Sequence, residues 1–267
     1  MSTGETIPRR VGRGVNLVLA FGSDLWRAVA PDHSPDDLAP FQPVSGKDGR
    51  GAPATQRDAW LWISGAEPDV TWHSAWAAAL AVDHAASLAV EQVCFTYRGG
   101  RDITGFIDGT ANPQVRRAPE VAIVPPGRPR AGGGHVLAMR WMHELGFNRL
   151  SLEGQQRVFG QTKPDSRELP AAEKPPAAHI SRVQTSVAGR ELEIFRRSVP
   201  YGTAAESGLY FVALSAERSR YDRTLARMFG NDPHGVRDRL TDFSRPVSGS
   251  YYFAPSLNVL NELAGEG

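Results

Sequence analysis

A stretch rich in proline and glycine near the middle of the chain most limits how this sequence can fold. Residues 112–133 contain the tripeptide ANP, the run IVPPGRP and several glycines. Proline removes a backbone donor and glycine weakens regular structure, so we expect no helix or strand there. The stretch therefore predicts a linker at 112–133 between a first half, residues 14–111, and a second half, residues 134–267.

Short apolar runs bounded by glycine, serine and acidic residues predict strands in both halves. The first half is expected to contain strand, loop, strand, helix and strand, at residues 15–21, 31–54, 59–63, 72–90 and 92–97. The second half is expected to contain strands at 134–142, 191–199, 209–214 and 251–253, and helices at 150–160, 220–229 and 236–243. Two α+β halves with a similar element order favour a duplicated ferredoxin-like architecture.

Composition and the absence of some motifs exclude several classes of protein. Thirty basic and 29 acidic residues give a formal charge of +1, which disfavours nucleic acid and anionic lipid as partners. No run approaches the roughly 20 apolar residues of a membrane span, and we expect a cytoplasmic protein. The single Cys94 excludes an internal disulfide and a thiolate metal cluster, so any metal must be held by histidine, carboxylates or a cofactor. Phosphate-binding loops and serine nucleophile elbows are absent.

The stretch GFIDGTANP, residues 105–113, places one acid, Asp108, between glycines and turn-forming residues. A chain reversal alone would need only an Asx-Gly turn. The acid therefore serves either the architecture of the loop or a reaction, and the loop by itself does not decide between them.

Two later segments add candidate site residues. His179 follows the proline-rich LPAAEKPPAA, which fixes the backbone that enters it and suits a metal ligand, whereas the other six histidines have contexts typical of structural or solvated residues. In ELEIFRRSVP, strand alternation puts Arg196 and Ser198 on the apolar face. A buried Arg196 needs an anionic partner, either in a core salt bridge or in a pocket that holds a carboxylate and a ligand oxygen; the remaining alternative is a strand end that emerges into water.

Five separated motifs resemble those of the dye-decolorizing peroxidases, and most closely those of their compact bacterial B-type branch. The motifs, in chain order, are GFIDGTANP, AHISRV, EIFRRSVPYG, GLYFVALS and DRLTDFSRPVSGSYYFAPS. The resemblance covers residues 14–262. It implies an α+β fold of two ferredoxin-like halves whose antiparallel sheets form a dimeric α+β barrel, with a b-type haem (heme b) in the second half.

The resemblance also implies a role for each matching residue. Asp108 corresponds to the acid above the haem, and His179 to the iron ligand. Arg196 corresponds to the arginine beside that acid, and Ser198 to a nearby polar residue. Further contacts with the haem are expected from Ile107, Gly109, Arg196, Leu209 and Phe211.

The second imidazole nitrogen of an iron-bound histidine needs an acceptor, and a carboxylate there raises the basicity of the ligand. The resemblance assigns this role to Asp242, with Asp238 as the second choice. The chemistry of the other residues agrees with their implied roles, because Asp108 can move a proton of peroxide and Arg196 can stabilise the charge that develops.

The implied function is that of a haem peroxidase, a homo-oligomer that uses hydrogen peroxide to oxidise dyes, phenols or similar small aromatic reductants through a ferryl intermediate. The alternatives are a non-catalytic haem-binding or haem-handling protein on the same scaffold, and a haem-free interaction module. Two departures from the family pattern accompany the resemblance. About a dozen residues precede the first matching segment, which implies a first half without its leading strand and helix, and Gln161 replaces an arginine expected near a haem propionate.

Overall fold

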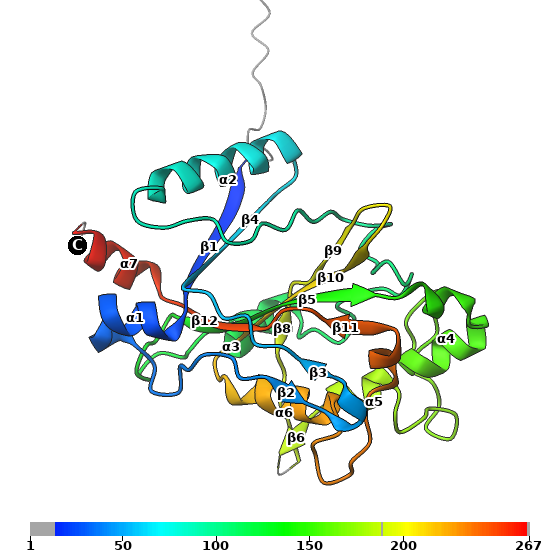
Figure 1. Cartoon of the computed structure of the whole chain (residues 1–267). Coiled ribbons are helices and arrows are strands. Elements are labelled where there is room, and N and C mark those ends of the chain that lie inside the picture. Colours follow the sequence, from blue (N-terminus) through cyan, green and yellow to red (C-terminus); the bar gives the residue numbers. More distant parts are fainter. Residues whose placement is uncertain (1–13, 188, 266–267) are drawn as a thin grey trace, which may run out of the picture.

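The centre of the molecule is one antiparallel sheet. The computed structural model describes residues 14–187 and 189–265, and eight strands within them form this sheet. Because β12 pairs with both β1 and β5, strands of the two halves share it (Figure 1). The main path, in spatial order, is β4 (Ala59–Gly65), β1 (Val15–Phe21), β12 (Ser250–Ala254), β5 (Gly134–His143), β10 (Ser207–Ser215) and β8 (Phe195–Arg196); β11 (Ser244–Pro246) also pairs with β5, and β9 (Val199–Gly202) with β10.

Helices and two short hairpins surround the sheet. In Figure 1, α5 and α6 lie below β5, whereas α2 lies above, beside β1 and β4. The α-helices are α1 (Ser23–Val29), α2 (Pro68–Val82), α3 (Ala118–Ala122), α4 (Leu152–Phe159), α5 (His179–Val183), α6 (Ser219–Met228) and α7 (Leu257–Ala264). The 3₁₀ helices are η2 (Pro31–His33), η3 (Lys47–Gly49), η4 (Val115–Arg117), η5 (Leu145–Arg149) and η6 (Arg239–Asp242). The hairpins pair β2 (Val44–Ser45) with β3 (Gly51–Ala52), and β6 (Ser186–Val187) with β7 (Arg190–Glu191).

Strand β5 separates two parts of the core. Its side chains alternate between the two faces of the sheet, as the pleat of a strand requires. Leu137, Met139 and Trp141 pack into the cluster that includes α6, and Val136 and Ala138 pack into a second cluster with β1, β4 and β12. The first of these faces forms one wall of the cavity described below.

Helix α6 covers that face because it is amphipathic. Its buried residues are Tyr221, Thr224, Leu225 and Met228, at the i, i+3, i+4 and i+7 spacing of a single helix face. The opposite side of the helix carries exposed charge, including Asp222. The helix therefore seals the sheet with one face and presents polar groups on the other.

The sequence patterns predicted most of the sheet and two of its helices. Strands β1, β4, β5, β10 and β12 and helix α6 lie where they were expected. Helix α4 is confirmed with slightly narrower bounds. Ser151 caps its beginning by accepting a hydrogen bond from the Gly154 amide at 3.1 Å, and Gly160 ends it with a φ of 80°.

The segment after α2 differs from the prediction. The helix expected to reach residue 90 ends at Val82, and residues 92–97 form no strand. Their one ladder contact is an isolated bridge between Tyr97 and Arg101. The Phe95 amide donates one hydrogen bond to the Pro200 carbonyl of β9 at 3.0 Å, but the segment forms no longer ladder among the described residues, and many of its apolar side chains are exposed.

The expectation of an irregular linker is also wrong in part, because η4 and α3 lie within it. Pro119 occupies the first turn of α3, where a missing N–H costs no helical hydrogen bond. Val121 is buried, and its carbonyl accepts a hydrogen bond from the Ala216 amide at 2.8 Å. Two further predictions were too long: the strand at 191–199 is divided among β7, β8 and β9, and the helix at 236–243 is only η6.

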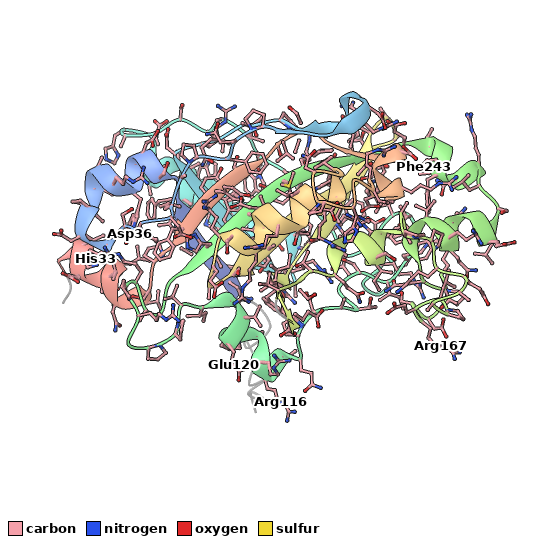
Figure 2. All side chains as sticks on the ribbon, turned by 90° about the horizontal axis from the view of Figure 1, so that it is seen from below. His33, Asp36, Arg116, Glu120, Arg167 and Phe243 are labelled. Atoms are coloured by element: carbon pink, nitrogen blue, oxygen red, sulfur yellow. The ribbon has the colours of Figure 1, made fainter. Side chains whose placement is uncertain are left out.

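Charged side chains project from the periphery of the molecule. Figure 2 shows Arg116 and Glu120 pointing away from the body near α3, and Arg167 pointing outward from the loop after α4. Within residues 14–187 and 189–265, no helix is both long enough and apolar enough to cross a lipid bilayer.

Candidate functional site

The main candidate site is a cavity bounded by β5, β10, α5, α6 and the loop of residues 105–113. Asp108, His179 and Arg196 all line this cavity. It is also lined by Ile107, Gly109, Leu209 and Phe211, so the structure brings these sequence-predicted residues together around one space. We call the side formed by α5 and η6 the helix wall, and the side formed by residues 105–113 and β8 the loop wall.

His179 begins α5 on the helix wall, directly after the proline-rich segment. The Ala178 amide donates to the Pro175 carbonyl at 2.9 Å, which fixes the turn into the helix. The His179 side chain is 29% exposed, and its Nδ1 donates to the Asp238 carboxylate at 2.6 Å. Nε2 is therefore the ring nitrogen that remains available to a metal.

The acceptor of the His179 hydrogen bond is Asp238, which corrects the expectation of Asp242. Asp238 is fully buried, and it caps η6 by accepting the Leu240 amide at 2.8 Å. Its second carboxylate oxygen then points at His179. Asp242 lies at the other end of η6, where it is bound by the Arg237 guanidinium at 2.8 Å.

The loop wall is held in place by Arg101. Its guanidinium donates to the carbonyls of Gly105, Lys163 and Pro164, which ties residues 105–113 to the segment after α4. Gly109 adopts a φ of 75°, in the left-handed region that favours glycine. This conformation lets the Gly109 amide donate to Oδ1 of Asp108 at 2.8 Å, so Oδ2 is the freer oxygen of that carboxylate.

Asp108 and Arg196 share the cavity without forming a close ion pair. Among the described residues, no salt bridge within 4.0 Å joins them, although their charges interact. Burial raises the pKa of Asp108 above its ordinary value, and the Arg196 charge offsets only part of that rise. Burial likewise lowers the pKa of Arg196, against the opposing influence of Asp108. Arg196 thus lines a cavity together with Asp108 and does not form a close salt bridge with it.

Asn112, in the same loop, is a positioning residue that the sequence analysis did not identify. Its side-chain amide donates to the Arg196 carbonyl at 2.8 Å and accepts from the Arg196 amide at 2.9 Å. These two hydrogen bonds fasten the Asp108 loop to β8. The asparagine of GFIDGTANP was visible in the sequence, but its partner lies 84 residues away and no local pattern indicates it.

Ser198 is not among the residues that line the cavity. Strands β8 and β9 nevertheless pair with β10 in one continuous register, which places Ser198 opposite Phe211 and on the same face as Arg196. The Ser198 hydroxyl lies 3.4 Å from the Val212 amide and can accept from it, and the implied role of Ser198 near Arg196 stays a prediction. Gln161, by contrast, does line the cavity.

The sequence analysis also did not identify a group of polar residues that line the cavity. His143 contacts the Asp102 carboxylate at 3.0 Å and the Ser244 hydroxyl at 2.8 Å. Burial favours a high pKa for Asp102, but the hydrogen bonds and charge of His143, together with Thr104, outweigh burial and lower it. These side chains give an otherwise apolar cavity a hydrogen-bonding edge.

Comparison with known proteins identifies this arrangement. Two family models match the chain: "Dyp-type peroxidase, N-terminal" at residues 2–96 and "Dyp-type peroxidase, C-terminal" at residues 99–259.

The chain belongs to the Dyp-type peroxidase family.

Relatives and solved structures agree with the family models. A dye-decolorizing peroxidase of Rhodococcus erythropolis is 32% identical over 254 residues, which cover 93% of this chain and 74% of the relative. DyPB from Rhodococcus jostii RHA1 has a TM-score of 0.90 and 32% identity, and the match covers 94% of this chain and 82% of that one. A dye-decolorizing protein from V. cholerae has a TM-score of 0.86 and 35% identity, with 93% and 82% of the two chains covered. The expected B-type resemblance is confirmed.

The Dyp-type peroxidase described here is an α+β enzyme with a haem cofactor, and it acts on peroxide and a reductant. A DypB variant from R. jostii RHA1 with a TM-score of 0.91 and 31% identity, matched over 96% of this chain and 84% of that one, is described in complex with heme. The missing leading strand and helix expected for the first half concern residues before Gly14, which lie outside the described residues.

The residues of the cavity fit a haem. Apolar side chains such as Leu209 and Phe211 would suit the porphyrin ring, and the Gln161 amide would be a hydrogen-bond donor for its carboxylates. His179 has the oriented, singly engaged imidazole that iron ligands commonly show. Within the described residues no three metal-binding side chains cluster together.

Proposed function

We propose that this peroxidase holds its haem iron through Nε2 of His179 and processes peroxide with Asp108 and Arg196. The observation that carries the proposal is the contrast within one cavity: His179 is bound at 2.6 Å to a buried carboxylate, while Asp108 and Arg196 are near each other but unpaired. When bound, the haem accepts oxidising equivalents from peroxide and returns them to a reductant.

Asp108 moves the proton in this scheme. Its Oδ1 is occupied by the Gly109 amide, so Oδ2 takes a proton from the inner oxygen of peroxide and delivers it to the outer oxygen. The raised pKa of Asp108 keeps the proton affinity of the carboxylate high enough to do this. Burial of the carboxylate is the main cause of this raised pKa, and the charge of Arg196 offsets only part of the rise.

Arg196 stabilises the negative charge that develops on the departing oxygen. Its guanidinium remains uncommitted to Asp108, so it can face a ligand oxygen. Asn112 holds its backbone, and β8 pairs with β10 through Ala213 and Leu214, which keeps its position fixed between turnovers. Asp238 keeps the His179 ring oriented through its hydrogen bond to Nδ1.

The test is rapid mixing of the haem-loaded protein with equimolar peroxide, followed by absorbance. Asp108→Asn should slow the reaction by about 10²–10⁴-fold, and Arg196→Leu by about 10²–10³-fold, while both keep the haem spectrum. Arg197→Leu is the matched control, because this neighbouring arginine is exposed, and it should react like the wild type. Unchanged kinetics in Arg196→Leu would remove that residue from the mechanism, and simple bleaching of the wild type would favour the haem-binding alternative.

We further infer a homo-oligomer, supported by the surface of α2. Trp72, Trp76 and Leu80 are 62%, 49% and 54% exposed, an apolar surface suited to a second copy of the chain. The solution mass of the wild type should exceed that of one chain, and a Trp72→Ser/Trp76→Ser variant should shift toward it. An unchanged mass for the variant would place the contact elsewhere.

The finer expectations on architecture and location stay predictions. We propose that the two halves, residues 14–111 and 134–267, are ferredoxin-like and form a dimeric α+β barrel, with 112–133 between them; the antiparallel pairing throughout the sheet supports this. A cytoplasmic location is supported by Cys94, which is a free thiol whose pKa is raised by burial to about 11. Dyes and phenols are the proposed reductants.

A further inference from the structure

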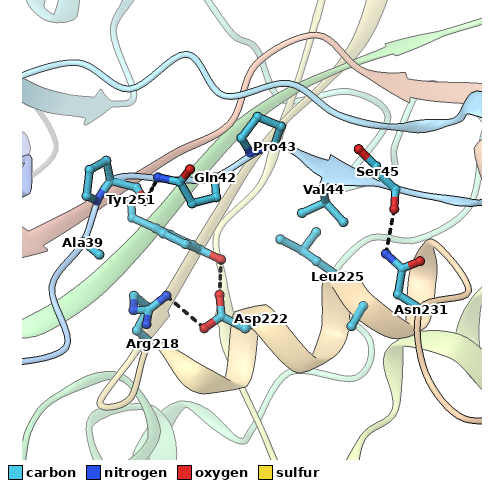
Figure 3. Close-up of a pocket in the computed structure, with 12 residues that line it drawn as sticks. Ala39, Gln42, Pro43, Val44, Ser45, Arg218, Asp222, Leu225, Asn231 and Tyr251 are labelled. Carbon is cyan, nitrogen blue, oxygen red and sulfur yellow. Dashed lines mark hydrogen bonds and ion pairs between the residues drawn. The ribbon is translucent and has the colours of Figure 1, made fainter.

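A second cavity of about 460 Å³ lies beside the sheet core, between α6, residues 39–45 and Tyr251 of β12 (Figure 3). Its volume falls within the range of small-ligand sites, roughly 300–1,000 Å³. Pro40 and Pro43 form flat apolar walls, and Gln42 and Asp222 add polar groups. We call it the outer pocket, and the cavity that contains His179 the haem cavity.

Two stacked tyrosine side chains connect the outer pocket and the haem cavity. Tyr251 of β12 lines the outer pocket, and Tyr221 of α6 lines the haem cavity. Their rings are stacked, with centroids 5.9 Å apart and planes inclined by 21°. Leu225 lines both spaces. An aromatic contact therefore runs from the outer pocket to the wall of the haem cavity.

The two phenols differ in what accepts their protons. Tyr251 donates to Oδ1 of Asp222 at 2.7 Å, so a carboxylate is ready to take its proton. Tyr221 donates to the backbone carbonyls of His135 at 2.8 Å and Ala213 at 3.0 Å, which are far weaker bases. A phenol becomes a neutral radical only if it loses a proton together with the electron. Tyr251 is thus equipped for reversible oxidation, whereas Tyr221 is equipped to remain a neutral aromatic bridge.

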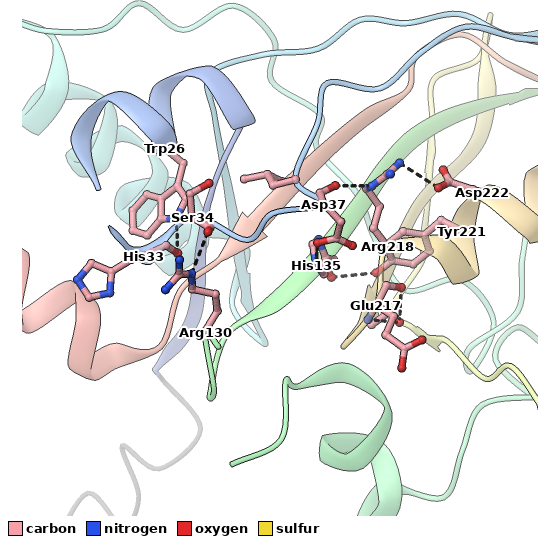
Figure 4. Close-up of polar contacts among 12 residues, drawn as sticks. Trp26, His33, Ser34, Asp37, Arg130, His135, Glu217, Arg218, Tyr221 and Asp222 are labelled. Atoms are coloured by element: carbon pink, nitrogen blue, oxygen red, sulfur yellow. Dashed lines mark hydrogen bonds and ion pairs between the residues drawn. The ribbon is translucent and has the colours of Figure 1, made fainter. Parts of the chain in front are cut away.

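The surroundings of Tyr251 hold this pair in place. Arg218 donates to Oδ2 of Asp222 at 2.9 Å and to the Asp37 carbonyl at 2.6 Å (Figure 4). Its guanidinium also lies 5.6 Å from the centroid of the Tyr251 ring. Arg218 thus fixes the Asp222 carboxylate beside the Tyr251 hydroxyl. Burial, followed by the Asp222 charge, raises the pKa of Tyr251, so the phenol is protonated at rest.

We propose that the outer pocket binds a phenolic electron donor and that Tyr251 transfers the donor's electron through Tyr221 to the haem cavity. The inference rests on the peroxidase function proposed above, because peroxide supplies the oxidant. One electron leaves Tyr251 toward the oxidised haem while its phenolic proton moves to Asp222. The donor then returns an electron to Tyr251, Asp222 returns the proton to the tyrosine oxygen, and the donor's own phenolic proton passes to solvent. Two such cycles use two donor molecules and reduce one peroxide to two waters.

The decisive variant is Tyr251→Phe, which keeps the stacked ring and removes the oxidisable hydroxyl. Haem-loaded protein is mixed with peroxide and a nitroso spin trap, and the trapped residue is located by peptide mass spectrometry. We expect the wild type to carry the adduct on Tyr251 and the variant to lose it. Tyr252→Phe is the matched control, because Tyr252 is a buried neighbour that lines neither space, and it should keep the adduct on Tyr251.

A binding measurement on haem-free protein tests the pocket without turnover. Guaiacol is the phenolic probe, and Ala39→Phe fills the outer pocket from the loop side, away from the tyrosines. We expect guaiacol to bind the wild type and Tyr251→Phe and to lose its affinity for Ala39→Phe. Equal affinity for the wild type and Ala39→Phe would overturn the outer pocket as the donor site.

Peroxide kinetics separate failure of this inference from failure of the proposed function. Tyr251→Phe should react with peroxide at the wild-type rate but oxidise guaiacol more slowly. A wild-type rate for both reactions, or an adduct on another residue only, would overturn the role of Tyr251 and leave the assignment of Asp108 and Arg196 intact. A wild type that fails to react with peroxide would overturn the proposed function and this inference with it.

Discussion

The two walls of the haem cavity are built on different principles. On the helix wall, His179 is tied directly to Asp238, a carboxylate with no exposed surface and a hydrogen bond on each oxygen. On the loop wall, Asp108 and Arg196 stay apart, and Arg196 is fastened through its backbone by Asn112. A metal ligand must keep one angle, whereas groups that handle a small substrate must leave room for it. The hydrogen bonds on each wall follow from that difference.

The electrostatics of the two walls follow the same division. Full hydrogen bonding on both oxygens compensates the burial of the Asp238 carboxylate. Asp108 has one amide donor on Oδ1 and no close cation, so its burial is left partly uncompensated and its pKa rises. The helix wall therefore holds its imidazole in one orientation, and the loop wall retains a carboxylate that readily takes up a proton.

The largest effect should come from removing the metal ligand. His179→Ala leaves the helix wall with no imidazole, so we expect loss of the bound haem or a large fall in its affinity, seen as a missing or shifted Soret band after reconstitution. His143→Ala is a useful comparison, since it alters the polar edge of the same cavity. A variant at position 179 that binds haem with wild-type affinity and spectrum would show that the iron ligand lies elsewhere.

The next effect distinguishes the two acids of η6. Asp238→Asn should lower haem affinity or peroxide activity by about 10–100-fold, because the imidazole loses its charged acceptor. Asp242→Asn should change haem affinity little, since Asp242 is bound to Arg237. Haem titrations of the two variants measure the difference. The reverse order of effects would restore Asp242 as the partner of the iron ligand.

A smaller effect is expected from removing the Asn112 side chain, which fastens the loop wall to β8. Asn112→Ala removes two hydrogen bonds to the Arg196 backbone, each contributing about 0.5–1.5 kcal/mol. We expect the peroxide reaction to slow by roughly tenfold, less than in Arg196→Leu. Asn148→Ala, at an exposed asparagine, serves as the control in the same rapid-mixing measurement. If both variants react like the wild type, the Asn112 hydrogen bonds do not position Arg196.

The smallest effect concerns the stability of the haem-free protein. Because the folded-state pKa of Asp108 is raised above its ordinary 3.8, its favourable contribution is fully present below the unfolded pKa and is lost as pH rises through the folded pKa. Asp108→Asn cannot ionise, so it should melt at a higher temperature than the wild type at neutral pH, with the difference shrinking below pH 3.8. Thermal melts across pH test this, and a variant less stable at neutral pH would contradict the assigned sign.

Site residues could be predicted from the sequence where a short motif contained them, and were missed where their partners lie far away in the chain. Asp108, Arg196 and His179 stand in compact motifs, and all three line one cavity. Asp238 was ranked below Asp242 as the acceptor for His179. The pattern DRLTD did contain a signal for it, because an aspartate just before a short helix is a typical capping residue. The place of Ser198 near Arg196 stays a prediction, because the register with β10 continues from β8 into β9 but Ser198 is not among the residues that line the cavity.

The same limit applies to the fold. Strands such as β5 were predicted because their alternation is visible within ten residues. The partner of Asn112 and the stacking of Tyr221 on Tyr251 depend on which distant elements pack together, and no local pattern carries that information. The strand expected at 92–97 failed for the related reason that strand propensity does not supply a continuous ladder: the segment has only one hydrogen bond to β9 and one isolated bridge.

The position of β12 also constrains the order of folding. This strand comes from near the end of the chain and lies between β1, from near its beginning, and β5. During synthesis, β1 and β4 can form a hairpin, but they cannot join the remainder of the sheet until β12 has left the ribosome. Contacts between such distant segments are slow to form because a long loop must close first. The β1–β4 hairpin should thus stay exposed until late in translation, which makes it the part of the nascent chain most in need of a chaperone.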